Sequence, residues 1–128
     1  MRLILDTHYL LWSMEDSPEL PARIRALLAD RENEIFISIA SLWEIAIKIS
    51  LGKLNLSGKS ISDLTQFLEQ AETTILPVLP SHLTVVEQMP WHHRDPFDRL
   101  IVAQAQVEGL RLVSADKVVA LYLPDVIA

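Results

Sequence analysis

The chain has 128 residues, no cysteine, only three glycines and few aromatic side chains. The lack of cysteine excludes disulfide bonds, thiolate metal sites and a cysteine nucleophile, and it fits a reducing compartment. So few glycines exclude a glycine-rich loop for phosphate binding. No apolar run approaches the roughly 20 residues of a membrane-spanning helix. We therefore expect one soluble, cytoplasmic domain over residues 1–128, with no membrane partner.

The charge balance is acidic, with 17 Asp and Glu against 11 Lys and Arg and a net charge of -6. A protein that binds nucleic acid through phosphate contacts alone is usually basic. Any role on nucleic acid must therefore rely on a local basic patch, a partner protein or bound cations. This balance argues against a simple DNA-binding module and leaves a nuclease open.

Short apolar runs alternate with helical patterns along the chain, and half of the residues are hydrophobic. Strands are predicted at 3–5, 35–38, 74–78 and 110–114, and the main helices at 9–14, 24–29, 42–49, 62–71, 83–88 and 96–108. A further short helix is expected after Asp116, and an edge strand near Val126. Strands that alternate with helices indicate an α/β protein whose parallel sheet is covered on both faces.

Four acidic residues fall near the carboxyl ends of the predicted strands, where open parallel sheets bind their ligands. They are Asp6 after the first strand, Glu44 in the helix after the second, Asp98 in the helix before the fourth, and Asp116 after the fourth. Carboxylates gathered at one edge repel one another unless cations neutralise them or some take up protons. Mg²⁺ suits such a group because it prefers oxygen ligands.

Helix capping and ion pairing on a helix surface explain the same acids one at a time. The structural alternatives are helix caps at Asp6 and Asp116, a cap and first-turn acid at Asp95 and Asp98, a capping box of Ser41 with Glu44, and an i,i+4 pair of Glu44 with Lys48. Taken singly, each alternative is the better explanation. Their shared position favours a metal site, so the residues alone leave both interpretations open.

Other chemically active side chains give weaker signals. His92 and His93 are adjacent in a loop rather than one helical turn apart, so we interpret them as ordinary polar residues of a loop. Trp12, Trp43 and Trp91 are expected to be packing residues. A serine hydrolase is disfavoured because no G-x-S-x-G elbow is present.

Four segments of the chain carry a family resemblance. They are LILDTHYLLW at 3–12, ISIASLWEIAIKISLGKL at 37–54, HHRDPFDRLIVAQA at 92–105 and LVSAD at 112–116. In their order and spacing these segments resemble the PIN-domain ribonucleases, and specifically the VapC-like toxins of type II toxin–antitoxin pairs. The resemblance covers essentially the whole chain.

The resemblance implies a PIN-like three-layer α/β/α sandwich with a central parallel sheet and a Mg²⁺ or Mn²⁺ site. The metal-binding and catalytic acids that it implies are Asp6, Glu44, Asp98 and Asp116, with Thr7, Asp95 and Ser114 as supporting residues. It also implies a homodimer, a cognate antitoxin that blocks the site, and cleavage of RNA. Known targets in the family include tRNA, rRNA and mRNA.

The leading hypothesis is thus a metal-dependent endoribonuclease that hydrolyses RNA with metal-activated water. The alternative is a catalytically silent PIN-type module that binds RNA or protein and keeps its acids as caps. An aspartyl-phosphate hydrolase would need a second acid in D-x-D, and Asp6-Thr7-His8 lacks it. Within DPFD, we expect Asp95 to shape the helix and Asp98 to bind metal.

Overall fold

A computed structural model describes residues 1–128. It contains one parallel sheet, whose four strands lie at the four main predicted strand positions. The strands are β1 (Arg2–Leu5), β2 (Glu34–Ser38), β3 (Thr74–Leu76) and β4 (Arg111–Val113). They lie in the order β3-β2-β1-β4, and all neighbours are parallel. β1 is therefore central between β2 and β4, which brings the carboxyl ends of these three strands to one edge.

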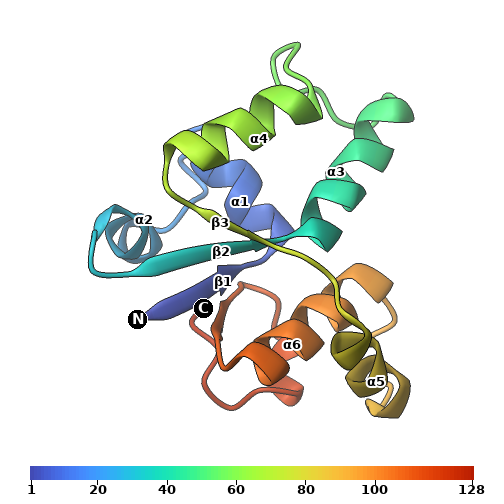
Figure 1. Cartoon of the computed structure of the whole chain (residues 1–128). Helices are drawn as coiled ribbons and strands as arrows, with labels where there is room; N and C mark the ends of the chain where they lie inside the picture. Colours follow the sequence, from blue (N-terminus) through green and yellow to red (C-terminus); the bar gives the residue numbers. More distant parts are fainter.

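Helices cover both faces of the sheet (Figure 1). They are α1 (Thr7–Met14), α2 (Ala22–Ala29), α3 (Ile39–Ser50), α4 (Ile61–Gln70), α5 (Pro80–Gln88) and α6 (Pro96–Glu108), followed by the short 3-10 helix η1 (Val119–Leu121). In Figure 1, α1, α3 and α4 lie above the sheet and α5 and α6 below it. The predicted α/β/α architecture is confirmed. No helix is long and apolar enough to cross a membrane.

The sheet separates two hydrophobic cores. Leu3 and Leu5 of β1 face the core shared with α1 to α4, whereas Ile4 faces the core shared with α6 and η1. Leu3 and Ile4 are both fully buried, so β1 is covered on both sides. This is why its sequence reads as a continuous apolar run rather than an alternating one.

α3 begins earlier than its apolar pattern predicted. β2 ends at Ser38, whose hydroxyl accepts a hydrogen bond from the Ala40 N–H and so serves as the N-cap. Ser41 therefore lies inside the first turn and Glu44 one turn later, and the predicted capping box of these two residues is wrong. The physical reason is that the strand passes into the helix with no loop between them.

Other element boundaries differ from the prediction for local reasons. β3 ends at Leu76 because Pro77 has no N–H to donate to a sheet ladder. α5 begins at Pro80, three residues before the predicted helix. The chain after Asp116 forms turns and then η1, and the edge strand expected near Val126 is reduced to one parallel bridge between Val113 and Ile127.

Candidate metal centre

Asp6 directly follows β1, and its buried carboxylate has two protein partners. Oδ1 accepts the Tyr9 N–H at 2.8 Å, which makes Asp6 the N-cap of α1. Oδ2 accepts the Ser114 hydroxyl at 2.6 Å. Burial raises the pKa of Asp6, although the bonds from Ser114 and Tyr9 oppose that rise. Asp6 is therefore a helix cap and, at the same time, a fixed carboxylate at the sheet edge.

Glu44 is buried on the second turn of α3, facing α1. Its Oε1 lies 3.0 Å from the hydroxyl of Thr7, which also contacts Ser41 Oγ at 3.0 Å. Its Oε2 lies 3.1 Å from Lys48 Nζ, so the predicted i,i+4 pair is confirmed. Thr7 was expected as a supporting residue, and here it orients the carboxylate of Glu44.

The two aspartates of DPFD have different environments. Asp95 Oδ1 accepts the N–H groups of Phe97 (2.8 Å) and Asp98 (3.2 Å), which confirms Asp95 as the N-cap of α6. The Asp98 carboxylate bonds to no backbone N–H and points away from the helix axis toward His93. Asp95 therefore caps the helix, whereas Asp98 lies in its first turn and caps nothing.

The charge on Asp98 is affected by acids from three parts of the chain. Its pKa is raised to about 6, first by burial, then by the charge of Asp95, and further by Glu44 and Asp6. The Asp98 side chain is 25% exposed. The carboxylates of Asp95, Glu44 and Asp6 thus lie close enough to disfavour the ionised form of Asp98.

Asp116 lies two residues after Ser114, in the loop that follows β4. Oδ1 accepts the Val118 N–H at 2.8 Å, and Oδ2 lies 2.8 Å from His93 Nε2. Although burial acts in the opposite direction, the hydrogen bonds from His93 and Val118 hold the pKa of Asp116 below its usual value. Asp116 is therefore stabilised as a carboxylate.

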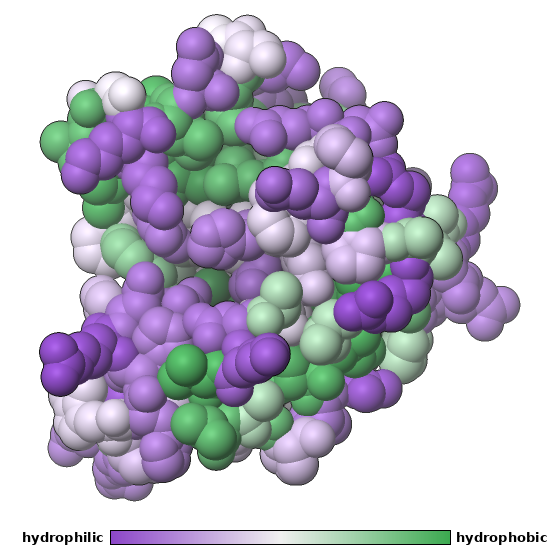
Figure 2. All heavy atoms as spheres, turned by 180° about the vertical axis from the view of Figure 1, so that it is seen from behind, coloured by the Kyte–Doolittle hydropathy of each residue, from purple (hydrophilic) through white to green (hydrophobic).

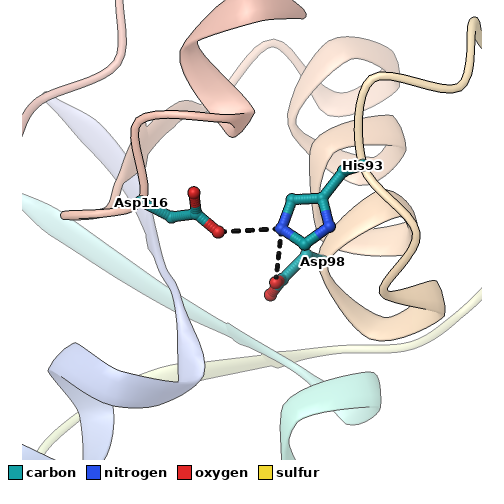
Figure 3. A group of neighbouring side chains, drawn as sticks. All are labelled: His93, Asp98 and Asp116. Carbon is teal, nitrogen blue, oxygen red and sulfur yellow. Dashed lines mark hydrogen bonds and ion pairs between the residues drawn. The ribbon is translucent and has the colours of Figure 1, made fainter.

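His93 joins two of the predicted acids, which sequence reasoning missed. Figure 3 shows its ring between Asp98 and Asp116, with Nε2 at 3.1 Å from the first and 2.8 Å from the second carboxylate. The interpretation of both histidines as ordinary polar residues of a loop is therefore wrong for His93. It holds for His92, which is exposed and packs against the Tyr122 ring at 4.9 Å.

The loop that carries His93 is held by Arg99, a buried residue that was not selected from the sequence. Arg99 Nη1 donates to the carbonyl of Pro90 (3.0 Å) and to the hydroxyl of Tyr122 (3.1 Å), and Nη2 donates to the carbonyl of Val86 (3.2 Å). The Trp91 ring stacks 3.8 Å from the guanidinium carbon. The position of Arg99, one residue after Asp98, was the available signal.

Trp91 and Trp43 pack against other side chains, as expected, but both are exposed. Trp91 is 76% exposed and covers Arg99 from outside. Trp43 is 60% exposed and meets the edge of Phe97 at 5.2 Å between ring centres. Trp43 and Phe97 each precede a predicted metal-binding acid, so this pair lies at the rim of the candidate centre.

The four predicted acids meet at one edge but are not equally close. Ligand atoms of His93, Asp98 and Asp116 lie within 4.8 Å of one another, and Asp6 and Glu44 stand outside this group. Seen from behind, hydrophilic side chains line a hollow between the half of the molecule with α3 and α4 and the half with α5 and α6 (Figure 2).

The donor set fits a hard divalent cation. Four carboxylates offer oxygen ligands, and Lys48 is the one lysine or arginine that pairs with any of them. Burial raises the pKa of Asp6 and of Asp98, so a negative charge on either carboxylate is unfavourable in the protein alone. Mg²⁺ or Mn²⁺ would supply the missing positive charge, and both accept oxygen ligands.

Comparison with known proteins gives one family and several similar structures. A family model described as PIN domain matches residues 3–122. No curated protein matches the sequence. The chain is similar to VapBC2 from Rickettsia felis bound to a fragment of promoter DNA, with 19% identity, 99% of this chain and 96% of that chain covered, and a TM-score of 0.69.

Two further solved structures show the same fold. FitAcB from Neisseria gonorrhoeae is 21% identical, with 98% of this chain and 95% of that chain covered and a TM-score of 0.67. A toxin–antitoxin complex from Klebsiella pneumoniae is 15% identical, with 98% and 96% covered and a TM-score of 0.66. At these identities the likeness concerns the arrangement of the chain rather than its chemistry.

Proposed function

Because this chain belongs to the PIN domain family, we propose that it is a metal-dependent endoribonuclease and the toxin of a type II toxin–antitoxin pair. On this proposal residues 1–128 form a single PIN domain. The observation that carries it is the meeting of four carboxylates at the carboxyl edge of the sheet, where the protein itself supplies little positive charge. The residues proposed as ligands are Asp6, Glu44, Asp98 and Asp116.

Neighbouring groups orient the carboxylates of the proposed ligands Asp6 and Glu44. Ser114 and the Tyr9 N–H hold the two oxygens of Asp6, and Thr7 holds Glu44. Each oxygen has a second lone pair that remains free for a cation. Mg²⁺ or Mn²⁺ bound there supplies an activated water and neutralises charge on the scissile phosphate.

A bound cation would also help the protein, which has a net charge of -6, to bind RNA. RNA phosphates are repelled by clustered carboxylates unless divalent charge lies between them. Lys48, 40% exposed beside Glu44, is a basic group next to the centre that can contact a phosphate.

Partner proteins follow from the same proposal. The Klebsiella pneumoniae relative is described as a toxin–antitoxin complex, and we propose that this chain also pairs with an antitoxin and forms a homodimer. An antitoxin segment that places Arg or Lys in the acidic centre would compete with the cation directly. A complex in which the inhibitor never approaches Asp6, Glu44 or Asp98 and leaves cation binding unchanged would contradict this mode of inhibition.

The alternative of a silent binding module explains the acids only one at a time. Capping accounts for Asp6, Asp95 and Asp116, each of which accepts a backbone N–H at the start of a helix or turn. The pair with Lys48 accounts for Glu44, and a place in the first turn of α6 accounts for Asp98. None of these separate explanations says why all four carboxylates lie at one edge of the sheet, and this shared position favours the metal-centre proposal.

RNA cleavage by purified protein, with Mg²⁺ or Mn²⁺ and with EDTA, tests the proposal on tRNA, an rRNA fragment and a single-stranded oligonucleotide. Glu44→Gln should lower cleavage at least about 100-fold, because the amide keeps the size of the side chain but lacks the charge that a cation requires. Glu69→Gln is the matched control, since Glu69 is exposed on α4 away from the centre. Cleavage that survives EDTA, or that persists in Glu44→Gln within a few-fold, would reject a metal-dependent mechanism.

A further inference from the structure

His93 reaches the candidate centre from a loop, and both of its ring nitrogens are engaged. Nδ1 accepts the backbone N–H of Asp95 at 3.1 Å. Nε2 faces the Oδ2 atoms of Asp98 and Asp116 at 3.1 and 2.8 Å (Figure 3). The imidazole thus connects the N-cap of α6 with the loop after β4.

The bond from Asp95 determines which nitrogen carries the proton in the neutral ring. A nitrogen that accepts an N–H must present its lone pair, so Nδ1 is unprotonated and Nε2 is the N–H donor. That donor is shared between two acceptor-only carboxylates. A metal ligand at Nε2 would need the opposite tautomer, which would set the Nδ1–H against the Asp95 N–H. The geometry therefore disfavours His93 as a ligand.

Asp98 depends on His93 more than any other acid in the centre does. The carboxylates of Asp6, Glu44 and Asp116 each contact two polar groups of the protein. These groups are the Tyr9 N–H and the Ser114 hydroxyl for Asp6, Thr7 and Lys48 for Glu44, and His93 and the Val118 N–H for Asp116. His93 is the one partner of the Asp98 carboxylate. Without it, no group of the protein would fix the rotation of that side chain.

Hydrogen bonds to neighbouring residues fix the backbone of His93. Its backbone N–H donates to the Tyr122 hydroxyl at 2.9 Å, and that hydroxyl donates to the Pro90 carbonyl at 2.7 Å. Arg99 donates to the same hydroxyl and to the His93 carbonyl. Backbone and ring are thus both fixed, so His93 can transmit a defined orientation to the carboxylates.

We propose that His93 is a positioning residue, whose Nε2–H donates to Asp116 and whose contact with Asp98 orients that carboxylate for a divalent cation, without His93 contacting the cation itself. The inference rests on the proposed function, because it assigns His93 a role in the same centre. Hydrogen bonds that orient ligating groups typically change metal affinity about 10- to 100-fold when they are lost.

Mn²⁺ titration followed by electron paramagnetic resonance measures this role without relying on RNA cleavage. His93→Leu should weaken Mn²⁺ binding about 10- to 100-fold. His93→Gln, whose amide can place an N–H near the Nε2 position, should stay within about five-fold of the unsubstituted protein. His92→Leu is the matched control, because its ring lies in the same loop and contacts Tyr122 rather than a carboxylate. Circular dichroism of each variant checks the fold.

Pulsed electron paramagnetic resonance of the unsubstituted protein with Mn²⁺ gives a second readout that requires no variant. The inference predicts no coupling from a directly bound imidazole nitrogen, and such a coupling would make His93 a ligand and overturn it. Equal affinity of His93→Leu and the unsubstituted protein would overturn it too, as would equal losses in His93→Leu and His93→Gln. If His93→Leu does not fold, the glutamine variant and the spectrum decide. Absence of Mn²⁺ binding in the unsubstituted protein would instead reject the proposed function.

Discussion

Replacing Asp98 with asparagine should stabilise the metal-free protein while weakening its metal binding. The carboxyl of Asp98 has a pKa raised to about 6, mainly by burial and then by the charge of Asp95. A raised pKa means that the folded protein favours the protonated form, so ionised Asp98 destabilises the fold. Asparagine keeps the size of the side chain and removes that charge.

The sign and size of the effect follow from proton linkage. An acid with a folded pKa of about 6 and an ordinary value of 3.8 contributes stability below about pH 4 and loses it as the pH rises through about 6. The shift of roughly two pKa units corresponds to at most about 3 kcal/mol. Because the side chain is 25% exposed, solvent screening lowers this to about 1–2 kcal/mol. That is a large share of the ~5–15 kcal/mol typical of a domain.

Urea unfolding of EDTA-treated protein between about pH 4 and pH 7 measures this gain. At pH 7 Asp98→Asn should be more stable than the unsubstituted protein by about 1–2 kcal/mol, and its stability should fall less as the pH rises. Asp95→Asn tests the cap, because asparagine caps a helix about as well as aspartate. It removes only the second cause of the raised pKa of Asp98, so it should stabilise the protein less than Asp98→Asn does and retain most of any cleavage activity.

Addition of Mn²⁺ should reverse the order of stability. A cation at a hundred times its dissociation constant stabilises the unsubstituted protein by about 2.7 kcal/mol, and Asp98→Asn should gain much less. Two results would refute the reasoning: a metal-free Asp98→Asn protein less stable than the unsubstituted one at pH 7, or an unchanged pH dependence. If Asp95→Asn lost metal binding as fully as Asp98→Asn while both stayed folded, the cap interpretation of Asp95 would also fail.

Three further substitutions test the supports around the centre. Ser114→Ala removes the 2.6 Å hydrogen bond to Asp6 and should raise the pKa of Asp6 further. Urea unfolding at pH 7 should show a loss of stability of about 1–3 kcal/mol, and unchanged stability would contradict this role of Ser114. Thr7→Val keeps the shape but leaves Glu44 without a hydroxyl donor, so Mn²⁺ affinity should fall about 10-fold, and equal affinity would contradict the orientation of Glu44 by Thr7. In Arg99→Lys the lysine cannot replace a guanidinium that donates from two nitrogens. Thermal unfolding should therefore show a loss of stability of about 2–4 kcal/mol, and a loss below about 0.5 kcal/mol would show that the positive charge alone is sufficient.

The sequence predicted the fold because its signals are local. Leu3, Ile4 and Leu5 form an unbroken apolar run that only a strand buried on both faces explains. Asp95 before Pro96, and Gly109 with a positive φ of 66°, delimit α6 to the residue. In each case the residues that determine the structure are neighbours in the chain.

The sequence missed features whose partners are distant or are backbone atoms. His93 meets Asp116 across 23 residues, and Arg99 donates chiefly to carbonyl groups, which every residue has. No spacing rule identifies such contacts. The predicted capping box of Ser41 and Glu44 failed for a related reason. The pattern matched locally, but pairing of β2 with β1 fixed the start of α3 three residues earlier.

Helix capping and metal binding were weighed as competing explanations for the acids, and the geometry makes them compatible. Asp6 and Asp116 each give one oxygen to a backbone N–H and turn the other toward the centre, where Ser114 and His93 hold it. A cap is thus a means of fixing a carboxylate, because the helix or turn that follows is a rigid partner. Glu44 and Asp98 lack that anchor, but the Thr7 hydroxyl donates to Glu44 and His93 Nε2 lies 3.1 Å from Asp98. Every proposed ligand therefore has its orientation fixed before a cation arrives, and the unfavourable proximity of the charges remains until one binds.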